Sequence, residues 1–230
     1  MYSLPESLIS LRLFGSAARG QHDLKSDVDV LAVYAQTPSA DERHQVKAVV
    51  QQLVGDVSVD LAEYSKDRIL HFFQTGHLFS WHLYRESNSL LGTDFISEGL
   101  RPEPYREAIS DTRRFIALVE SSIQALQDEN STVVFEAGIL YLASRNIAMC
   151  LSWLLSASPN FQRFAPFDIS HDADVTSPFT KKEYEILVNC RFASTRGTTV
   201  TPPERKEIIE LAHRIIRWGN VLLLKCTHTN

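Results

Sequence analysis

Four residues near the N-terminus are the best candidates for chemistry. Gly15 and Ser16 follow a short apolar run, and Asp27 and Asp29 flank the first residue of a second one. Successive side chains of a β-strand alternate between its two faces, so Asp27 and Asp29 are expected on the same side. Two carboxylates this close repel each other unless a cation lies between them. Ligand sets made only of oxygen favour a hard ion such as Mg²⁺.

The Gly15-Ser16 pair has the features of a phosphate-binding turn. Glycine permits a tight turn and the close approach of a ligand. Backbone N–H groups in such a turn, together with the serine hydroxyl, can hold a phosphate. Arg19 and Lys25 add positive charge nearby, and Ser26 adds a second hydroxyl. A phosphate loop followed by a carboxylate pair predicts metal-assisted nucleotide chemistry.

The combined pattern resembles the signature of the DNA polymerase β nucleotidyltransferase superfamily. That signature is Gly-Ser, ten intervening residues, and then Asp-x-Asp, which this chain carries as Gly15-Ser16 and Asp27-Val28-Asp29. The dipeptides Arg19-Gly20 and Ser26-Asp27 also match. Each motif is common alone, but the two together at this spacing, flanked by strand-like runs, are specific. The motif resemblance covers about the first third of the chain.

The resemblance implies an activity and a set of site residues. The reaction is transfer of a nucleoside monophosphate, with ATP the favoured donor and AMP the group moved, to an acceptor hydroxyl with release of pyrophosphate. Asp27 and Asp29 would hold two Mg²⁺ ions. Asp60, on the neighbouring strand, would supply the third carboxylate, since adjacent strands lie about 4.8 Å apart. Glu63 is a competitor expected to point to the opposite face.

The same resemblance assigns nucleotide-binding residues. Gly15 and Ser16 would hold the β- and γ-phosphates, and Arg19, Lys25 or Ser26 would neutralise their charge. Transfer of this kind depends mainly on positioning and electrostatic support.

The elements that must position these residues can be predicted for residues 1–100. Strands are expected at Leu11–Phe14, Val28–Tyr34 and Val57–Leu61. A helix is expected over Ala40–Val54, where Ser39 and Glu42 form a capping box. A further helix is expected over Tyr64–Gly76 with Ser65 as its N-cap, followed by an aromatic-rich strand over His77–Tyr84.

The pattern changes to helices after Arg101-Pro102-Glu103-Pro104, because two prolines interrupt regular structure. We therefore predict a nucleotidyltransferase domain over residues 1–100 and a helical domain over residues 101–230. The fold class is α+β, with a small mixed sheet followed by an all-α, up-and-down helical bundle. Expected helical segments are marked by Ile109 to Leu126, Val133–Ser156, a capping box at Thr180 with Glu183, and the run from Thr201 to about Lys225. Ser158–Pro178 is expected to be a loop.

Bulk properties exclude several classes of protein. The 230 residues carry a net charge of −5, which argues against bulk nucleic-acid binding. The three widely spaced cysteines favour free thiols in a reducing cytoplasm. The N-terminus lacks the pattern of a signal peptide. Val133–Leu155 is interrupted by polar residues and is expected to be a buried helix instead of a membrane span.

Several polar residues outside the motif have less specific support. Glu136, near the start of the most apolar helix, is a candidate acceptor-activating base. Whether Glu136, Arg145, Arg191 or Arg196 enter the active site is left open by the sequence. A loop is expected around His171–Asp174. His71, His77 and His82 lack the spacing of a zinc motif and receive no catalytic role.

The acceptor separates the leading hypothesis from its alternatives. A nucleotidyltransferase domain followed by a helical bundle resembles kanamycin-type antibiotic nucleotidyltransferases, which implies a small-molecule acceptor such as an aminoglycoside-like compound. It also resembles minimal nucleotidyltransferases that pair with HEPN-type helical proteins, which implies AMP transfer to a partner protein as in nucleotidyltransferase antitoxins. A third hypothesis is that the protein is a non-catalytic, nucleotide-binding regulatory module. Base preference and oligomeric state, including a homodimer, are left open.

Overall fold

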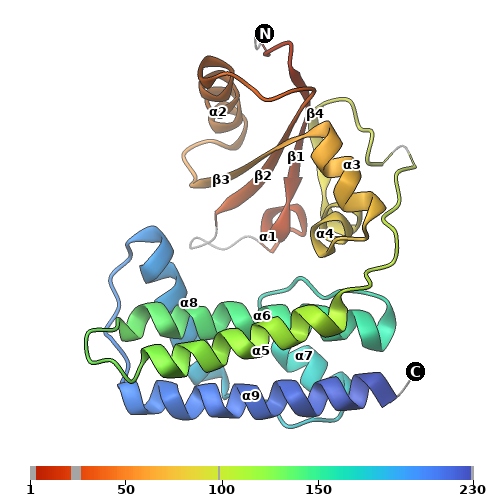
Figure 1. Cartoon of the computed structure of the whole chain (residues 1–230). Helices are drawn as coiled ribbons and strands as arrows, with labels where there is room; N and C mark the ends of the chain where they lie inside the picture. Colours follow the sequence, from red (N-terminus) through yellow and green to blue (C-terminus); the bar gives the residue numbers. More distant parts are fainter. Residues whose placement is uncertain (1–3, 22–26, 98, 229–230) are drawn as a thin grey trace. The chain divides into compact units, whose positions relative to one another are not determined.

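The computed structural model describes residues 4–21, 27–97 and 99–228 of the chain. It divides into two compact units, Met1–Arg106 and Glu107–Asn230 (Figure 1). The first unit carries a four-stranded mixed sheet, and the second is built from helices. The predicted α+β fold class, a small mixed sheet followed by a helical part, is confirmed.

The sheet of the first unit has the strand order β3-β2-β1-β4. Strands β1 and β2 pair antiparallel, as do β1 and β4, whereas β2 and β3 run parallel. A parallel pair needs a crossover connection, and helix α2 between β2 and β3 provides it. The strands are β1 Leu8–Phe14, β2 Val28–Tyr34, β3 Val59–Ser65 and β4 Asn88–Gly92.

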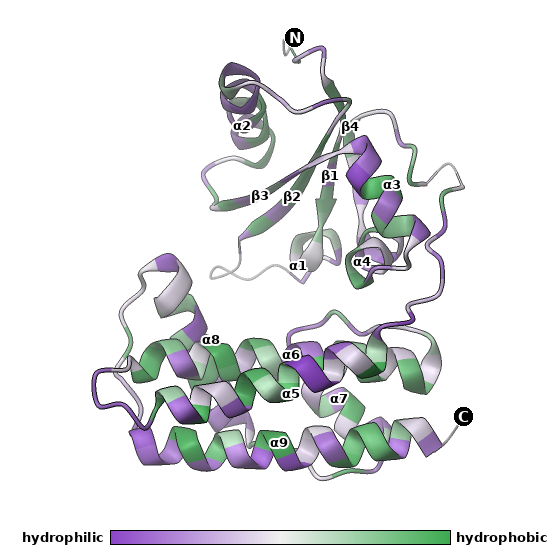
Figure 2. Cartoon of the chain, in the orientation of Figure 1, coloured by the Kyte–Doolittle hydropathy of each residue, from purple (hydrophilic) through white to green (hydrophobic). Residues whose placement is uncertain are grey.

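Apolar residues make up much of strands β1 and β2 (Figure 2), and their alternation gives the sheet two apolar faces. Val28, Val30 and Ala32 of β2 pack with helix α2 on one face. Leu31 and Val33 of the same strand pack on the other face with residues from helices α3 and α4. The helices of this unit are α1 Gly15–Ala18, α2 Ala40–Val54, α3 Lys66–Gln74 and α4 Leu78–Glu86.

Local capping signals place the helix starts of this unit. Ser39 accepts a hydrogen bond from the Glu42 backbone, and the Glu42 side chain accepts one from the Ser39 backbone, so the predicted capping box is confirmed. Ser65 caps α3, as expected, by accepting from the Arg68 backbone. Strand β3 begins and ends later than predicted, because Val59–Ser65 continues up to that cap.

The prediction of a strand over His77–Tyr84 is wrong. Most of this segment lies in helix α4. His77 is the N-cap of this helix, and its ring nitrogen accepts a hydrogen bond from the Phe79 backbone N–H at 3.1 Å. The aromatic residues that favoured a strand instead bury one side of the helix: Trp81 is 6% exposed and Leu83 is fully buried. The fourth strand is β4, Asn88–Gly92, a segment for which the sequence analysis predicted no strand.

The second unit is a helical bundle around one apolar core. Helix α6 contacts α5, α7, α8 and α9, so it is the central helix. The predicted capping box of α8 is confirmed, with Thr180 and Glu183 bonded reciprocally. The helices are α5 Ala108–Ala125, α6 Val133–Ser156, α7 Ala165–Asp172, α8 Lys181–Arg196 and α9 Arg205–His228.

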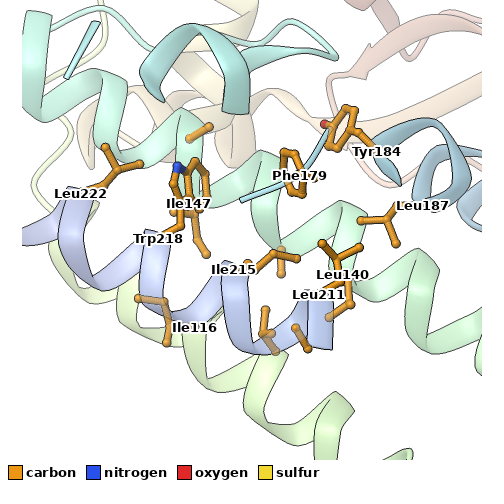
Figure 3. Packing of buried hydrophobic residues seen from close by; sticks show 14 of the residues in the cluster. Ile116, Leu140, Ile147, Phe179, Tyr184, Leu187, Leu211, Ile215, Trp218 and Leu222 are labelled. Atoms are coloured by element: carbon orange, nitrogen blue, oxygen red, sulfur yellow. The ribbon is translucent and has the colours of Figure 1, made fainter. Parts of the chain in front are cut away.

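Figure 3 shows the core of the bundle at the level of Ile147 and Trp218. Ile147 of α6 is fully buried, and Trp218 of α9 is 3% exposed. Two polar side chains buried in this core are hydrogen-bonded. Trp218 Nε1 donates to Ser170 Oγ at 2.8 Å. The Tyr184 hydroxyl donates to the Arg163 carbonyl at 2.6 Å. Such pairing removes the cost of burying these groups.

The expected loop over Ser158–Pro178 is only partly correct. It contains helix α7, with Pro166 in its first turn, where proline costs no backbone hydrogen bond. His171 and Asp172 therefore end a helix, and both side chains are exposed. The prolines of this segment predicted a loop, but Pro166 lies in the first turn of a helix.

Helix α6 is the one helix, among the residues that the structure describes, long and apolar enough to cross a membrane. Mostly buried core helices pass the same test of length and composition, and 56% of the most apolar window of α6 is buried in the bundle. Cys150, Cys190 and Cys226 are all buried. Burial raises the pKa of the Cys190 and Cys226 thiols.

Candidate active site

The candidate site is built on the parallel strands β2 and β3. Asp29 pairs with Asp60 in the register of these strands, and Val30 pairs with Leu61. Paired residues of adjacent strands point to the same face of a sheet. The two carboxylates that the sequence analysis assigned to neighbouring strands are therefore brought side by side.

Asp29 also lies against the glycine of the predicted phosphate turn. Gly15 follows β1 directly and has a backbone φ of +71°, which favours glycine. A Cβ atom at this position would lie 2.1 Å from Asp29 Oδ2, so no other residue fits without displacement. Register supports this proximity, because Phe14 of β1 pairs with Asp29 of β2. The Gly-Ser turn and the second aspartate of Asp-x-Asp are therefore in direct contact.

Asp27 directly precedes β2 and is partly buried. Its place two residues before Asp29 puts both on one side of an extended backbone. Among residues 4–21, 27–97 and 99–228, no three His, Cys, Asp or Glu side chains gather closely enough to hold a metal ion. The donor set of Asp27, Asp29 and Asp60 is nevertheless all carboxylate, which fits the chemistry of Mg²⁺.

Glu63 lies on the other face of the sheet, as predicted. It accepts a hydrogen bond from the buried Tyr34 hydroxyl at 2.9 Å and lies 3.8 Å from Arg43 of α2. Burial, followed by the bond to Glu63, raises the pKa of Tyr34 well above its ordinary range. This contact assigns Glu63 to the packing of α2 and leaves Asp60 as the carboxylate beside Asp29.

Arg19 ends the short turn that begins at Gly15. Its backbone N–H donates to the Gly15 carbonyl at 3.3 Å, and its side chain reaches helix α4. The Arg19 guanidinium donates through Nη1 to Glu86 and through Nε to Gln21, the latter at 3.0 Å. The predicted phosphate-binding cation is thus held beside the turn. Lys25 and Ser26, also predicted to bind nucleotide, lie outside the described residues.

The bundle residues named in the sequence analysis have mainly structural contacts. Glu136 is 9% exposed in the first turn of α6, and its role as an acceptor base stays a prediction. Arg145 donates to the Phe161 carbonyl at 2.6 Å, and so ties α6 to the segment before α7. The Arg196 guanidinium lies 4.3 Å from the centre of the Phe192 ring. Arg191 packs its backbone against Gly138 of α6.

Sequence reasoning missed Glu86 and His82 on helix α4. His82 Nε2 lies 3.0 Å from Glu86 Oε2, a spacing of four residues that pairs side chains only on a helix. The spacing of four residues between a histidine and a glutamate was visible in the sequence. The strand expected over this segment would have kept the two side chains too far apart to pair.

Comparisons with known proteins agree with this architecture. A family model described as "Nucleotidyltransferase domain" matches residues 3–84. No curated protein matches the sequence. The crystal structure of spectinomycin adenyltransferase AAD(9) from Enterococcus faecialis, with ATP and spectinomycin, has a TM-score of 0.51 at 12% identity, covering 96% of this chain and 92% of that one. At this identity the likeness concerns the fold.

Two toxin–antitoxin structures are similar over a smaller part of the chain. One, solved with AMP-PNP, has a TM-score of 0.30 at 21% identity and covers 54% of this chain and 90% of that one. The other, a mutant of MntA-HpeT, has a TM-score of 0.29 at 20% identity and covers 54% and 89%.

The family match spans strands β1, β2 and β3, the Gly-Ser turn and the Asp-x-Asp pair described above, and ends before β4. The likeness in fold to AAD(9) extends over nearly the whole chain. Residues 3–84 of this chain are therefore similar to a nucleotidyltransferase domain, and these residues carry the Gly-Ser turn and the Asp-x-Asp pair.

Proposed function

We propose that the protein transfers AMP from ATP to a hydroxyl group of a small-molecule acceptor and releases pyrophosphate. The observation that carries the proposal is the in-register pair of Asp29 and Asp60 beside Gly15. Carboxylates can hold a metal ion, and the backbone of the neighbouring glycine turn can hold the phosphates bound to that ion. This is the chemistry expected of a nucleotidyltransferase domain.

Each site residue has a role in this proposal. Asp27, Asp29 and Asp60 would hold Mg²⁺, which when bound neutralises charge on the phosphates and stabilises the attacking and leaving oxygens. Gly15 allows the triphosphate to approach the backbone, and Ser16 offers a hydroxyl. Asp60 is exposed on β3, so it can also accept the proton of the acceptor hydroxyl.

A small-molecule acceptor is favoured by the extent of the fold likeness. AAD(9), whose structure contains ATP and spectinomycin, matches this chain over both units, including the helical bundle. The net charge of −5 is also compatible with a cationic acceptor. The acceptor here need not be spectinomycin, since the two chains share only 12% of their residues.

The test is transfer of radiolabel from each NTP labelled at the α-phosphate. The protein is incubated with Mg²⁺ and one NTP, either alone, with a panel of aminoglycosides and spectinomycin, or with a cell lysate. Label on a small molecule, most strongly with ATP, is the expected result. Label on a single lysate protein would show that the acceptor is a protein and not a small molecule. Binding of NTP without any transfer would favour a regulatory module.

The matched control is Asp29→Asn, which removes one carboxylate charge and preserves the size of the side chain. The variant is expected to give no label in any arm. Equal labelling by Asp29→Asn would contradict the site assignment even if the wild-type protein is active.

A further inference from the structure

The guanidinium of Arg19 is held from helix α4. Nη1 donates to Glu86, while Nε donates to Gln21 at 3.0 Å. Within the described part of the chain, no acceptor for Nη2 is found. The side chain is 16% exposed, so it has little freedom to leave this position. One edge of the guanidinium is therefore fixed by the protein, and the N–H groups of Nη2 remain for a ligand.

Glu86 is shared between two basic side chains. It accepts from Arg19, and the His82 ring nitrogen Nε2 lies 3.0 Å from its Oε2. Burial opposes ionisation of Glu86, but the nearby His82 ring and the Arg19 guanidinium outweigh it and hold the pKa of Glu86 below its ordinary value. Glu86 is consequently a carboxylate at neutral pH, with both neighbours oriented by its charge.

His82 connects the same pair to the end of β1. Its ring packs edge-on against Phe14, with 5.5 Å between ring centres, and Phe14 is the residue before Gly15. Phe79, one turn earlier on α4, also packs edge-on against Phe14, at 5.6 Å. Asn88, just after α4, donates to the Ala18 carbonyl at 3.3 Å. Helix α4 thus contacts Phe14, just before the turn, and Arg19 at its end, while Asn88 at the start of β4 holds Ala18 between them.

We propose that Glu86, supported by His82, is a positioning residue that orients Arg19 toward the triphosphate of the bound nucleotide. The inference rests on the proposed function and adds two residues to it. A free arginine side chain loses rotamer entropy when it binds phosphate, whereas one already held by two acceptors loses less. Neither Glu86 nor His82 needs to touch the nucleotide.

The test is a double-mutant cycle on nucleotide binding, read by calorimetry with Mg²⁺ and α,β-methylene ATP, which cannot undergo transfer. Glu86→Gln is expected to weaken binding about 3- to 10-fold in the wild-type background, the cost of immobilising one long side chain. In the Arg19→Ala background it is expected to change nothing further, because Glu86 acts only through Arg19.

Matched variants separate positioning from folding. Asp67→Asn removes the same charge from an exposed site on α3 and is expected to leave binding unchanged. His82→Phe keeps an aromatic ring against Phe14 but removes Nε2, and should weaken binding in the same direction as Glu86→Gln. If Glu86→Gln does not fold, Glu86→Asp, which keeps the charge but shortens the reach, takes its place in the cycle.

Two results would overturn the inference alone. An equal loss in the Arg19→Ala background would mean that Glu86 acts independently of Arg19. Tighter binding by Glu86→Gln would mean that Glu86 competes with the triphosphate for Arg19. If the wild-type protein itself does not bind α,β-methylene ATP, both the proposed function and this inference fail, so the two failures are distinguishable.

Discussion

Asp29 and Asp60 are register partners on parallel strands, and the Asp29 carboxylate also lies against Gly15. The contact joins three segments: the end of β1, the start of β2 and the start of β3. Residues 15, 29 and 60 are far apart in sequence, and the sheet is what brings them together. A change at any of the three is therefore a test of the same site.

The first prediction concerns the carboxylates. Asp29→Asn and Asp60→Asn are each expected to lower the rate of AMP transfer at least about 100-fold, because metal-assisted charge stabilisation contributes several kcal/mol. The fold should persist, since both side chains are at least partly exposed. The rate is measured by label transfer and the fold by circular dichroism. Glu63→Gln, on the opposite face of β3, is the control and should retain activity.

The second prediction concerns Gly15. Gly15→Ala should abolish nucleotide binding, because the new Cβ would lie 2.1 Å from Asp29 Oδ2. The left-handed backbone adds about 1–2 kcal/mol of strain. Gly55→Ala is the matched control: Gly55 also has positive φ, at +78°, but nothing lies within 4 Å of its added Cβ. An equal loss of nucleotide binding in the two variants would show that backbone strain, and not contact with Asp29, causes the loss.

Local signals in the sequence were sufficient for several elements. Strand β2 and helices α2 and α6 have the predicted bounds, and the capping boxes at Ser39 and Thr180 form as expected. Each of these rests on residues close in sequence: a hydroxyl three residues before an acid, or a continuous apolar run. The family resemblance implied the position of Asp60 on the strand next to Asp29, and the register of β2 and β3 pairs the two residues.

What the sequence did not reveal depends on distant contacts. Helix α4 was expected to be a strand, since its aromatic residues favour strands and only packing against Phe14 and α3 makes them a buried helix face. Arg12 is a second case. A charged residue within an apolar run gives no sign that it is 1% exposed, because its partners Ser87, Asp94 and Ser97 lie more than seventy residues away.

The third prediction concerns this buried arginine and pH. Partial burial opposes ionisation of Asp94, but bonds from Ser97 and Arg12 outweigh it and hold the pKa of Asp94 below its ordinary value. A carboxyl whose pKa is lower in the folded state stabilises the fold above its unfolded pKa. That contribution is lost as the pH falls through the folded pKa. Asp94→Asn should therefore destabilise the first unit by about 1–3 kcal/mol at pH 7.

The measurement is hydrogen exchange of the β1 amides, which reports on this unit without interference from the bundle. The difference between wild type and Asp94→Asn should be largest at pH 7 and should shrink as the pH is lowered. A difference that stays constant down to acid pH would show that the charge of Asp94 does not matter. Asp67→Asn removes a carboxylate from an exposed site on α3 of the same unit and is expected to have little effect.

The fourth prediction compares two glycines inside helices of the bundle. A Cβ at Gly138 of α6 would lie 3.1 Å from the Arg191 Cα, part of the α8 backbone. A Cβ at Gly219 of α9 would lie 3.2 Å from Ile116 Cδ1, the far end of a side chain. Alanine favours a helix over glycine by about 1 kcal/mol at either position. The sign of the change in stability therefore depends on whether the neighbour can move.

Gly138→Ala is expected to destabilise the bundle by about 1–2 kcal/mol, because α6 and α8 must separate to admit the methyl group. Gly219→Ala should be neutral or stabilising by up to about 1 kcal/mol. Both are measured by denaturant unfolding, followed by fluorescence of Trp153 and Trp218 in a Trp81→Phe background, so that only the bundle is observed. If both variants gain stability equally, the α6–α8 crossing is not limited by the Gly138 contact, and the close approach of these helices has another cause.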